Sequence, residues 1–266
     1  MATQRMLIWQ GPSQLDGQDI IVLATGVPKA PRLKRDGTPY KTRASKTKAS
    51  ANAKTGDMIQ IHILVSDVNP TAALKSGADI SICGVCPHKS VAAGGSGACY
   101  THGNLRRGFA QTGTYNAHME HGSAPFDLER FRGMRVRFGA YGDPAAAPFA
   151  IWQAIAAVAA GVTGYTHQWR AADIGFANFC MASADSADEG RQARKMGYRN
   201  FIVRAPGEAK PRGAVVCPAS AEAGKRTVCA SCMQCGGNGN GRTNDITIIA
   251  HGGSSKRFRP LPLTVA

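Results

Sequence analysis

Short apolar runs recur along the chain and dominate its pattern of hydrophobic and polar positions. Near the N-terminus, Asp19–Thr25 and Met58–Val65 are apolar enough to predict two buried strands. Later in the chain, strand-like runs alternate with helical segments, which is typical of a parallel sheet with helical crossovers. The later strands are predicted at Gly133–Phe138, Val162–Trp169, Phe176–Ser183, Tyr198–Arg204, Gly213–Cys217 and Asp245–His251.

The helical segments between these strands carry start and stop signals. One helix is predicted at Pro148–Ala160, with proline at its first position and Gly161 just beyond its last. A second helix is predicted at Ser186–Met196, where Ser186 is followed three residues later by a glutamate, as in a capping box. The order of elements therefore predicts an α/β fold.

Within that class, many strands and few long helices favour a partial (β/α) barrel over residues 81–266, preceded by a β-rich segment over 1–80. Several predicted strands end in chemically capable side chains, namely Tyr141, Asp143, His167, Ser183, Asp185, Arg204, Cys217 and His251. In parallel barrels the active site forms at these strand ends. The candidate catalytic residues are His167, Asp185, Arg204 and His251. Alternatively, these ends are polar only because they reach the surface.

Composition narrows the class of protein. The chain has 266 residues, of which 43% are hydrophobic, so wholesale disorder is excluded. The first residues lack the apolar core of a signal peptide. The longest apolar run, Ala145–Ala160, is interrupted by Pro148 and Gln153 and is too short to span a bilayer. We therefore expect a soluble protein of the cytoplasm without a membrane partner.

The chain is strongly basic, with 32 Lys and Arg against 17 Asp and Glu and a formal net charge of +15. Nine of the basic residues fall between Lys29 and Lys54, in a stretch without apolar periodicity that reads as a loop over 29–54. One interpretation is an arm that contacts the phosphates of a nucleic acid or nucleotide. The other is a solvated basic loop. The candidate contacts are Lys34, Arg35, Lys41, Arg43, Lys46 and Lys48.

Eight cysteines in a chain of this kind indicate metal or cluster ligands before disulfides. Four of them lie in a loop over 217–241 that is rich in small and turn residues: Cys217, Cys229, Cys232 and Cys235. Four thiolates with two-residue spacings suit tetrahedral Zn²⁺ or an iron–sulfur cluster. We expect a metal or cluster here, and both alternatives stay open.

Another three cysteines, Cys83, Cys86 and Cys99, form a second candidate set. His88 or His102 can complete it as a structural zinc site. Alternatively, three thiolates can hold an iron–sulfur cluster with one open iron, and an open position is what chemistry requires. Cys180 lies within an apolar run and is predicted to be a buried, inert thiol.

Two motifs resemble those of radical S-adenosylmethionine (SAM) enzymes. Tyr100 follows Cys99, as in the Cys-Tyr that often closes their cluster motif, and Tyr141-Gly142-Asp143-Pro144 is similar to their Gly-Glu-Pro motif. The resemblance implies a partial (β/α)₆ barrel, a [4Fe–4S] cluster at Cys83, Cys86 and Cys99, and SAM contacts from Tyr100, Tyr141, Gly142 and Asp143. The cysteine spacing differs from the usual Cys-x3-Cys-x2-Cys, and aspartate replaces glutamate.

Most of the chain also resembles an uncharacterised family of bacteriophage proteins. The common elements include Cys-x2-Cys-Pro, Ala-Cys-Tyr, Gly-Tyr-Thr-His-Gln-Trp at 164–169 and the C-terminal cysteine cluster. This resemblance implies a host-cell cytoplasmic location and brings no established activity.

Three functional hypotheses follow. The first is a radical-SAM-like iron–sulfur enzyme that acts on nucleic acid or a nucleotide. The second is a non-catalytic, zinc-stapled nucleic-acid-binding protein, whose affinity would fall steeply with salt. The third is a barrel enzyme for glycosidic-bond cleavage or base exchange, with structural zinc and with Asp143 or Asp185 as its carboxylate.

Overall fold

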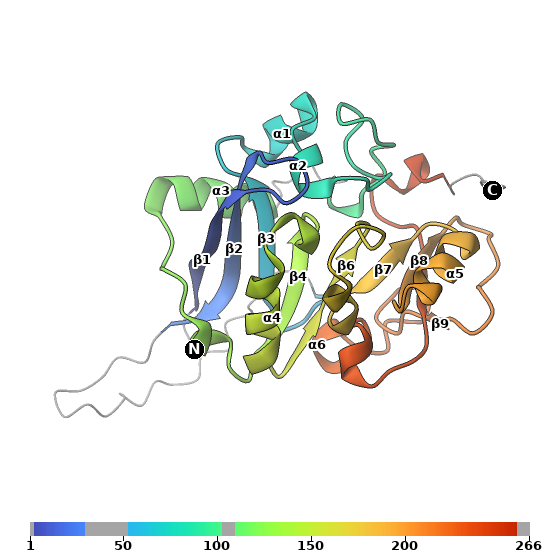
Figure 1. Ribbon diagram of the computed structural model, residues 1–266. Helices are drawn as coiled ribbons and strands as arrows, with labels where there is room; N and C mark the ends of the chain where they lie inside the picture. The colour runs from blue at the N-terminus through green and yellow to red at the C-terminus, as the bar shows by residue number, and fades with distance from the viewer. Residues whose placement is uncertain (1–2, 30–52, 103–109, 260–266) are drawn as a thin grey trace.

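A computed structural model describes residues 3–29, 53–102 and 110–259, which form a mixed α/β structure with two five-stranded sheets (Figure 1). The first sheet has the order β1-β2-β3-β4-β5, and the second has the order β6-β7-β8-β10-β9. The strands are β1 (Thr3–Pro12), β2 (Asp19–Pro28), β3 (Ile59–Val65), β4 (Arg135–Tyr141), β5 (Gly161–Thr163), β6 (Tyr165–Thr166), β7 (Met181–Ala184), β8 (Asn200–Arg204), β9 (Val215–Val216) and β10 (Ile246–Ile249).

The first sheet is half antiparallel and half parallel. β1, β2 and β3 pair antiparallel, whereas β3, β4 and β5 pair in parallel. Every residue of β3 is buried, including the polar side chains of Gln60 and His62, because the strand is central in the sheet. Because β3 pairs with β4, one sheet runs across the boundary predicted near residue 80, and the N-terminal strands are part of the same sheet as the later ones.

The second sheet is entirely parallel. It begins where the first ends, because Gly164 alone separates β5 from β6. A Cβ atom at Gly164 would lie 2.5 Å from the Cys180 sulfur, so this junction requires glycine. The two sheets are open within the described residues, and no closed barrel is formed.

The helices are short. They are α1 (Pro70–Ser76), α2 (Ile80–Cys83), α3 (Ala110–His121), α4 (Phe149–Val158), α5 (Ala187–Lys195) and α6 (Cys229–Cys232). Single 3₁₀ segments lie at Tyr100–His102, Leu128–Phe131, Pro144–Ala146, Ile174–Asn178, Asn238–Asn240 and Ser255–Arg257. Among the helices of the described ranges, none combines the length and the apolar composition needed to cross a bilayer.

The capping serine predicted for α5 is confirmed, whereas α4 differs from its predicted end signals. Pro148 is the N-cap of α4 and not its first helical residue, and Gly161 begins β5 after the Ala159 C-cap. The Ser186 hydroxyl accepts the Glu189 backbone N–H at 3.2 Å and begins α5, although the Glu189 carboxylate accepts the N–H of Asp185, one residue before the cap. In α4, Trp152 is fully buried against Phe138, with ring centroids 4.9 Å apart, which seals the helix onto the first sheet.

Five of the six later predicted strands are shorter than expected, and two of them change most. The segment predicted as Val162–Trp169 divides into β5 and β6 at Gly164. The segment predicted as Phe176–Ser183 begins in a 3₁₀ turn, because the Asp173 carboxylate accepts the Gly175 N–H at 2.7 Å and starts that turn. Only Met181–Ala184 of that run is a strand.

Candidate functional site

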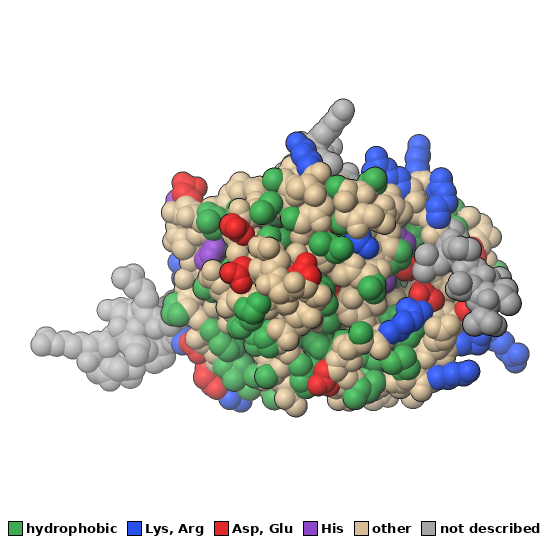
Figure 2. Space-filling model, turned by 45° about the horizontal axis from the view of Figure 1, so that its top comes forward, with side chains coloured by type: hydrophobic (Ala, Val, Ile, Leu, Met, Phe, Trp, Pro, Cys, Tyr) green, Lys and Arg blue, Asp and Glu red, His purple; other side chains and the backbone are tan. Residues whose placement is uncertain are grey.

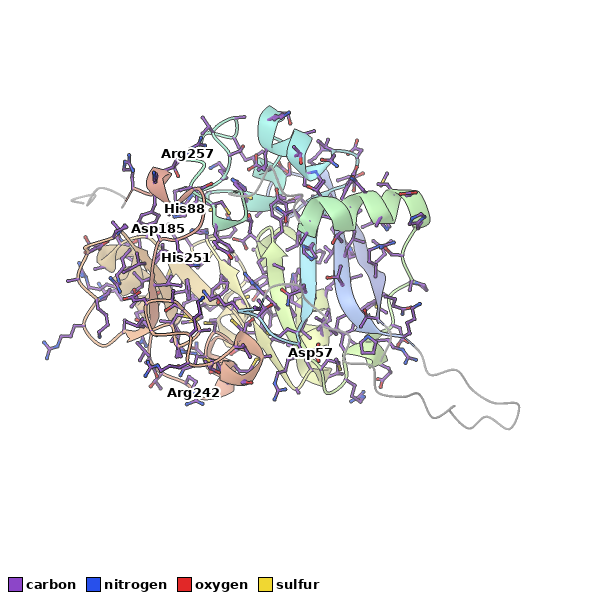
Figure 3. The ribbon with its side chains drawn as sticks, turned by 180° about the vertical axis from the view of Figure 1, so that it is seen from behind. Asp57, His88, Asp185, Arg242, His251 and Arg257 are labelled. Atoms are coloured by element: carbon purple, nitrogen blue, oxygen red, sulfur yellow. The ribbon has the colours of Figure 1, made fainter. Side chains whose placement is uncertain are left out.

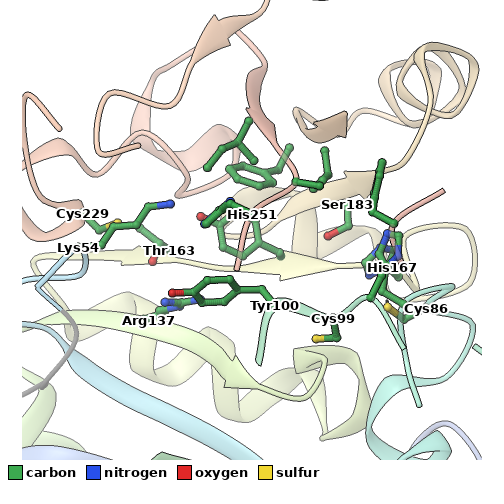
Figure 4. A pocket seen from close by; sticks show the side chains of 18 residues that line it. Lys54, Cys86, Cys99, Tyr100, Arg137, Thr163, His167, Ser183, Cys229 and His251 are labelled. Atoms are coloured by element: carbon green, nitrogen blue, oxygen red, sulfur yellow. Dashed lines mark hydrogen bonds between the residues drawn. The ribbon is translucent and has the colours of Figure 1, made fainter. Parts of the chain in front are cut away.

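A cavity of about 240 Å³ lies between the two cysteine sets. Cys86 and Cys99 of the first set line it, and so does Cys229 of the second. Figure 4 shows Cys229 at one end of the cavity, Cys86 and Cys99 at the other, and aromatic side chains between them. The two sets therefore border one cavity from opposite ends.

The first set is held by a loop over residues 84–99 that lies near the C-terminal ends of the parallel strands (Figure 1). Cys83 ends α2, and the backbone N–H of Cys86 donates to the Cys83 carbonyl at 3.0 Å. Further along, the Asp79 carboxylate is fully buried and accepts both the N–H and the hydroxyl of Ser90. These contacts fix the loop that carries Cys86 and Cys99 next to Cys83, the last residue of α2.

Crowding among these thiols shapes their acidity. Burial raises the pKa of Cys83 well above its ordinary value, and the neighbouring Cys86 and Cys99 thiolates raise it further. Burial also opposes ionisation of Cys99, but hydrogen bonds from His102 and Thr101 outweigh it and lower the pKa of Cys99 to about 7. Several thiolates can coexist here only when a cation compensates their charge.

The second set packs at the other end of the strands, around residues 217–235. The backbone N–H of Cys229 donates to the Lys54 carbonyl at 2.9 Å, just before β3, and the Gly164 N–H donates to the Cys235 carbonyl at 3.2 Å. Arg199, 1% exposed, donates to the Gly237 and Asn244 carbonyls and so ties the end of this loop to β8.

These four sulfurs line a common space, with Tyr165 and Phe201 beside them. Burial is the main cause that raises the pKa of Cys235 to about 12. A hydrogen bond with Tyr165 opposes the rise, and the neighbouring thiolates of the second set add to it. As in the first set, mutual proximity makes ionisation costly without a bound cation.

Three polar side chains meet beside the first set. Asp185 follows β7, and its two carboxylate oxygens lie 2.7 Å from His88 Nε2 and 3.2 Å from His167 Nε2. His167 follows β6, and its Nε2 is 3.9 Å from the Cys86 sulfur. Figure 3 shows His88 next to Asp185 near His251.

The electrostatics of this group favour a charged pair. Burial alone would raise the pKa of Asp185, but hydrogen bonds to His167 and His88 hold it well below its usual range. Conversely, burial would lower the pKa of His167, yet the Cys86 thiolate and Asp185 raise it well above its ordinary value. Asp185 therefore stays ionised between the imidazoles of His88 and His167.

Asp143 is buried and does not line the cavity. Its carboxylate accepts the backbone N–H of Ala145 at 3.0 Å and that of His167 at 2.8 Å, and the Gln168 amide lies 3.3 Å away. The carboxylate oxygens are thus occupied by the protein itself. Their arrangement assigns Asp143 to the positioning of His167.

Its neighbours in the Tyr-Gly-Asp-Pro motif are also packed against the fold. Tyr141 is 3% exposed, and its hydroxyl is buried without a hydrogen-bond partner in the described part of the chain. Burial raises the pKa of Tyr141, and the nearby Cys83 thiolate adds to this increase, so the hydroxyl lies close to the first cysteine set. Gly142 has a φ of +77° and touches β3 closely.

Replacing Gly142 tests this close approach. A Cβ atom there would lie 2.8 Å from the Ile63 carbonyl oxygen, whereas at Gly133, with a φ of +70°, it would meet nothing within 4 Å. We expect Gly142→Ala to lower the free energy of unfolding by about 1 kcal/mol more than Gly133→Ala, since both share the left-handed backbone cost. Urea denaturation measures the difference, and equal losses would contradict it.

The remaining predicted residues separate into two groups. His251 and Tyr100 line the cavity with ring centroids 4.9 Å apart. Arg204, the buried last residue of β8, instead pairs with Glu222 and donates to the Glu208 carbonyl at 2.7 Å. These contacts give it a structural role. Trp169 is buried, and its indole N–H donates to the Ser183 carbonyl.

Sequence reasoning missed Arg137, which lines the cavity from β4. Its Nε is buried without a hydrogen-bond partner among the described residues. In the sequence, a basic residue between the apolar positions of a strand predicts only a side chain on the solvent-facing side of the sheet. In the fold, the second sheet covers that side, so Arg137 lines the cavity between them. His88 was considered only as a fourth ligand of the first set.

The basic-loop residues from Lys34 to Lys48 lie outside the described residues. In the space-filling view, most visible Lys and Arg side chains lie over the half of the molecule that carries the second sheet, whereas acidic side chains are more frequent on the opposite half (Figure 2). The visible surface is therefore unevenly charged, but the basic side chains on it do not outline a groove.

Comparison of the chain with protein-family models, with curated proteins and with solved structures finds no match.

Proposed function

We propose that this protein is an iron–sulfur enzyme of radical-SAM-like design, whose substrate occupies the cavity between the two cysteine sets. The observation that carries the proposal is that cysteines of both sets line the same cavity from opposite ends. A metal site that only stabilises the fold does not require an adjacent cavity, whereas a catalytic site does. In this proposal the two open sheets correspond to a partial (β/α) barrel, and the first cysteine set lies at the C-terminal ends of its strands.

The spacing of the ligand atoms favours a cluster over a single zinc ion at the first set. Four sulfurs on one Zn²⁺ at about 2.3 Å lie about 3.8 Å apart. Among the described residues, the group of three metal-ligand atoms within 4.8 Å of one another is His88, His167 and Asp185, and it contains no cysteine sulfur. More widely spaced sulfurs suit a multi-iron cluster, in which each thiolate binds a different iron.

An unpartnered hydroxyl adds support. The buried Tyr141 hydroxyl adjoins the first set and has no acceptor among the described residues. A buried hydroxyl without a partner is costly, and a cluster sulfide would provide an acceptor for it. In radical SAM enzymes, the cluster supplies the electron that cleaves SAM.

The residues of this chain would bind and orient the substrate. Arg137 and Lys54 place positive charge at one end of the cavity, and none of the described residues that line it is Asp or Glu, so an anionic substrate is favoured over a cationic one. Tyr165, Phe201 and Tyr100 supply ring surfaces in the same cavity. An anionic group joined to a planar ring is the chemistry of a nucleotide, free or in a nucleic acid.

Metal analysis tests the proposal. We expect protein purified without oxygen to be brown and to contain iron and acid-labile sulfide. Cys99→Ala should remove one cluster, about half of the iron if both sets hold clusters, because Cys99 belongs to the first set alone. Cys180→Ala is the matched control, since Cys180 is a buried cysteine that belongs to neither set, and it should leave iron and sulfide unchanged.

Two results would contradict the proposal. A colourless protein with zinc and no sulfide would instead support a zinc-stapled binding protein. Loss of all bound metal, iron and zinc together, in Cys99→Ala, with the fold intact by circular dichroism, would mean that the seven cysteines do not divide into two independent sets.

A further inference from the structure

We propose that His88, His167 and Asp185 form a binding site for a single divalent transition-metal ion, separate from both cysteine sets. Three segments bring these side chains together: the loop after α2, the end of β6 and the end of β7. Their ligand atoms all lie within 4.8 Å of one another. This inference uses no sulfur ligand and does not rest on the iron–sulfur proposal.

The geometry favours convergence on one point. The His88 and His167 rings are 5.8 Å apart at 74°, and the Nε2 atom of each faces the same carboxylate. Donor atoms around a first-row metal with bonds of about 2.0–2.2 Å lie roughly 3 Å apart. The separations of 2.7 and 3.2 Å between Asp185 and the two nitrogens are of that size.

The donor atoms are also held in place from behind. The backbone N–H of His167 is fixed by the buried Asp143 carboxylate, and the Asp185 N–H by Glu189. The His88 ring packs on Phe258, with centroids 5.1 Å apart. Ligands supported in this way lose little conformational freedom when a metal binds.

Donor chemistry and exposure define the class of ion. Two imidazoles and one carboxylate suit Fe²⁺, Mn²⁺, Co²⁺ or Zn²⁺, and this set leaves coordination positions open. His88 and His167 line the cavity, whereas the Asp185 side chain is only 1% exposed. The open positions would therefore face the cavity, where a substrate oxygen or water can bind.

The alternative is a hydrogen-bonded His–Asp–His chain that binds no metal. The carboxylate already accepts from both rings in that arrangement, so distances alone do not separate the two. A measurement of metal binding separates the two arrangements, because a His–Asp–His chain that is only hydrogen-bonded does not bind Co²⁺.

The experiment uses Co²⁺ as the probe on the anaerobically purified full chain. Equilibrium dialysis counts the bound ions, and absorption spectra distinguish sulfur ligation, which gives intense near-ultraviolet charge-transfer bands, from nitrogen and oxygen ligation, which gives only weak visible bands. We expect one Co²⁺ per chain with the weak bands alone. Asp185→Asn and His88→Gln should each weaken it about 100-fold or more.

His121→Gln is the matched control, because His121 is an exposed histidine at the end of α3. It should bind Co²⁺ as the wild type does. Two near-isosteric variants at different positions guard against misfolding of either one, and thermal melts identify a variant that is unfolded.

Equal cobalt affinity in the wild type and in both folded variants would overturn the site. So would weak-band cobalt binding that His121→Gln also abolishes. Iron and sulfide contents, measured on the same samples, report on the cysteine sets alone, so failure of this site is distinguishable from failure of the proposed function.

Discussion

Loss of the metal or cluster that we propose at Cys217, Cys229, Cys232 and Cys235 is expected to unfold the second sheet. The apolar core beneath that sheet is small, with Met181, Ile246 and Ile248 as its large members, and Cys217 itself belongs to it. Metal binding at such a site contributes folding free energy directly. We expect Cys235→Ser to lower the free energy of unfolding by at least about 5 kcal/mol, measured by denaturant titration without oxygen.

Cys99→Ser is the comparison for this prediction. Cys99 lies in a loop over the large core of the first sheet, which includes Trp152, Phe138 and Ile61. Its replacement should therefore cost far less stability than Cys235→Ser. Equal losses in the two variants would show that the second set does not hold its sheet together.

Acidification is expected to destabilise the protein through His62. Burial on β3, reinforced by the nearby Arg137 charge, lowers the pKa of His62 from 6.5 to about 4. The unfolded chain therefore binds a proton near pH 6.5 that the folded protein rejects until about pH 4. The contribution of His62 to the free energy of unfolding is fully present above pH 6.5. It is lost as the pH falls through this interval, by about 3 kcal/mol in all.

His62→Gln isolates this contribution. Glutamine does not titrate and retains a polar end near Thr25, whose hydroxyl lies 3.5 Å from His62 Nε2. Urea denaturation at intervals between pH 7 and pH 4 should give a flatter stability profile for the variant. An unchanged slope would assign the acid sensitivity to other groups.

The strands and helices were the most predictable part of the structure. Predominantly apolar runs marked β2 and β3, and start signals at Pro148 and Ser186 marked α4 and α5 to within two residues. Local propensity and burial decide these elements, and both can be read from a few neighbouring residues. Whether the sheets close into a barrel cannot be read in this way. It depends on the backbone direction at Gly164, where the nearby Cys180 sulfur leaves no room for a side chain.

The candidate site was predictable in its members and not in its arrangement. Side chains at the ends of parallel strands placed His167 and Asp185 side by side, as the topology requires. The partner His88 comes from a loop, and loop contacts have no period. Similarly, the sequence marks Asp143 as an acidic residue after a strand, but only the fold shows that backbone N–H groups occupy its carboxylate.

The junction at Gly164 has a consequence for how such a protein can diversify. One extended segment, residues 161–166, supplies the last strand of one sheet and the first of the other. There is no linker whose length could change between the halves, so insertions cannot alter their separation. New specificity must therefore arise from the loops around the cavity and from the side chains that line it, while the distance between its two cysteine-bearing ends is inherited unchanged.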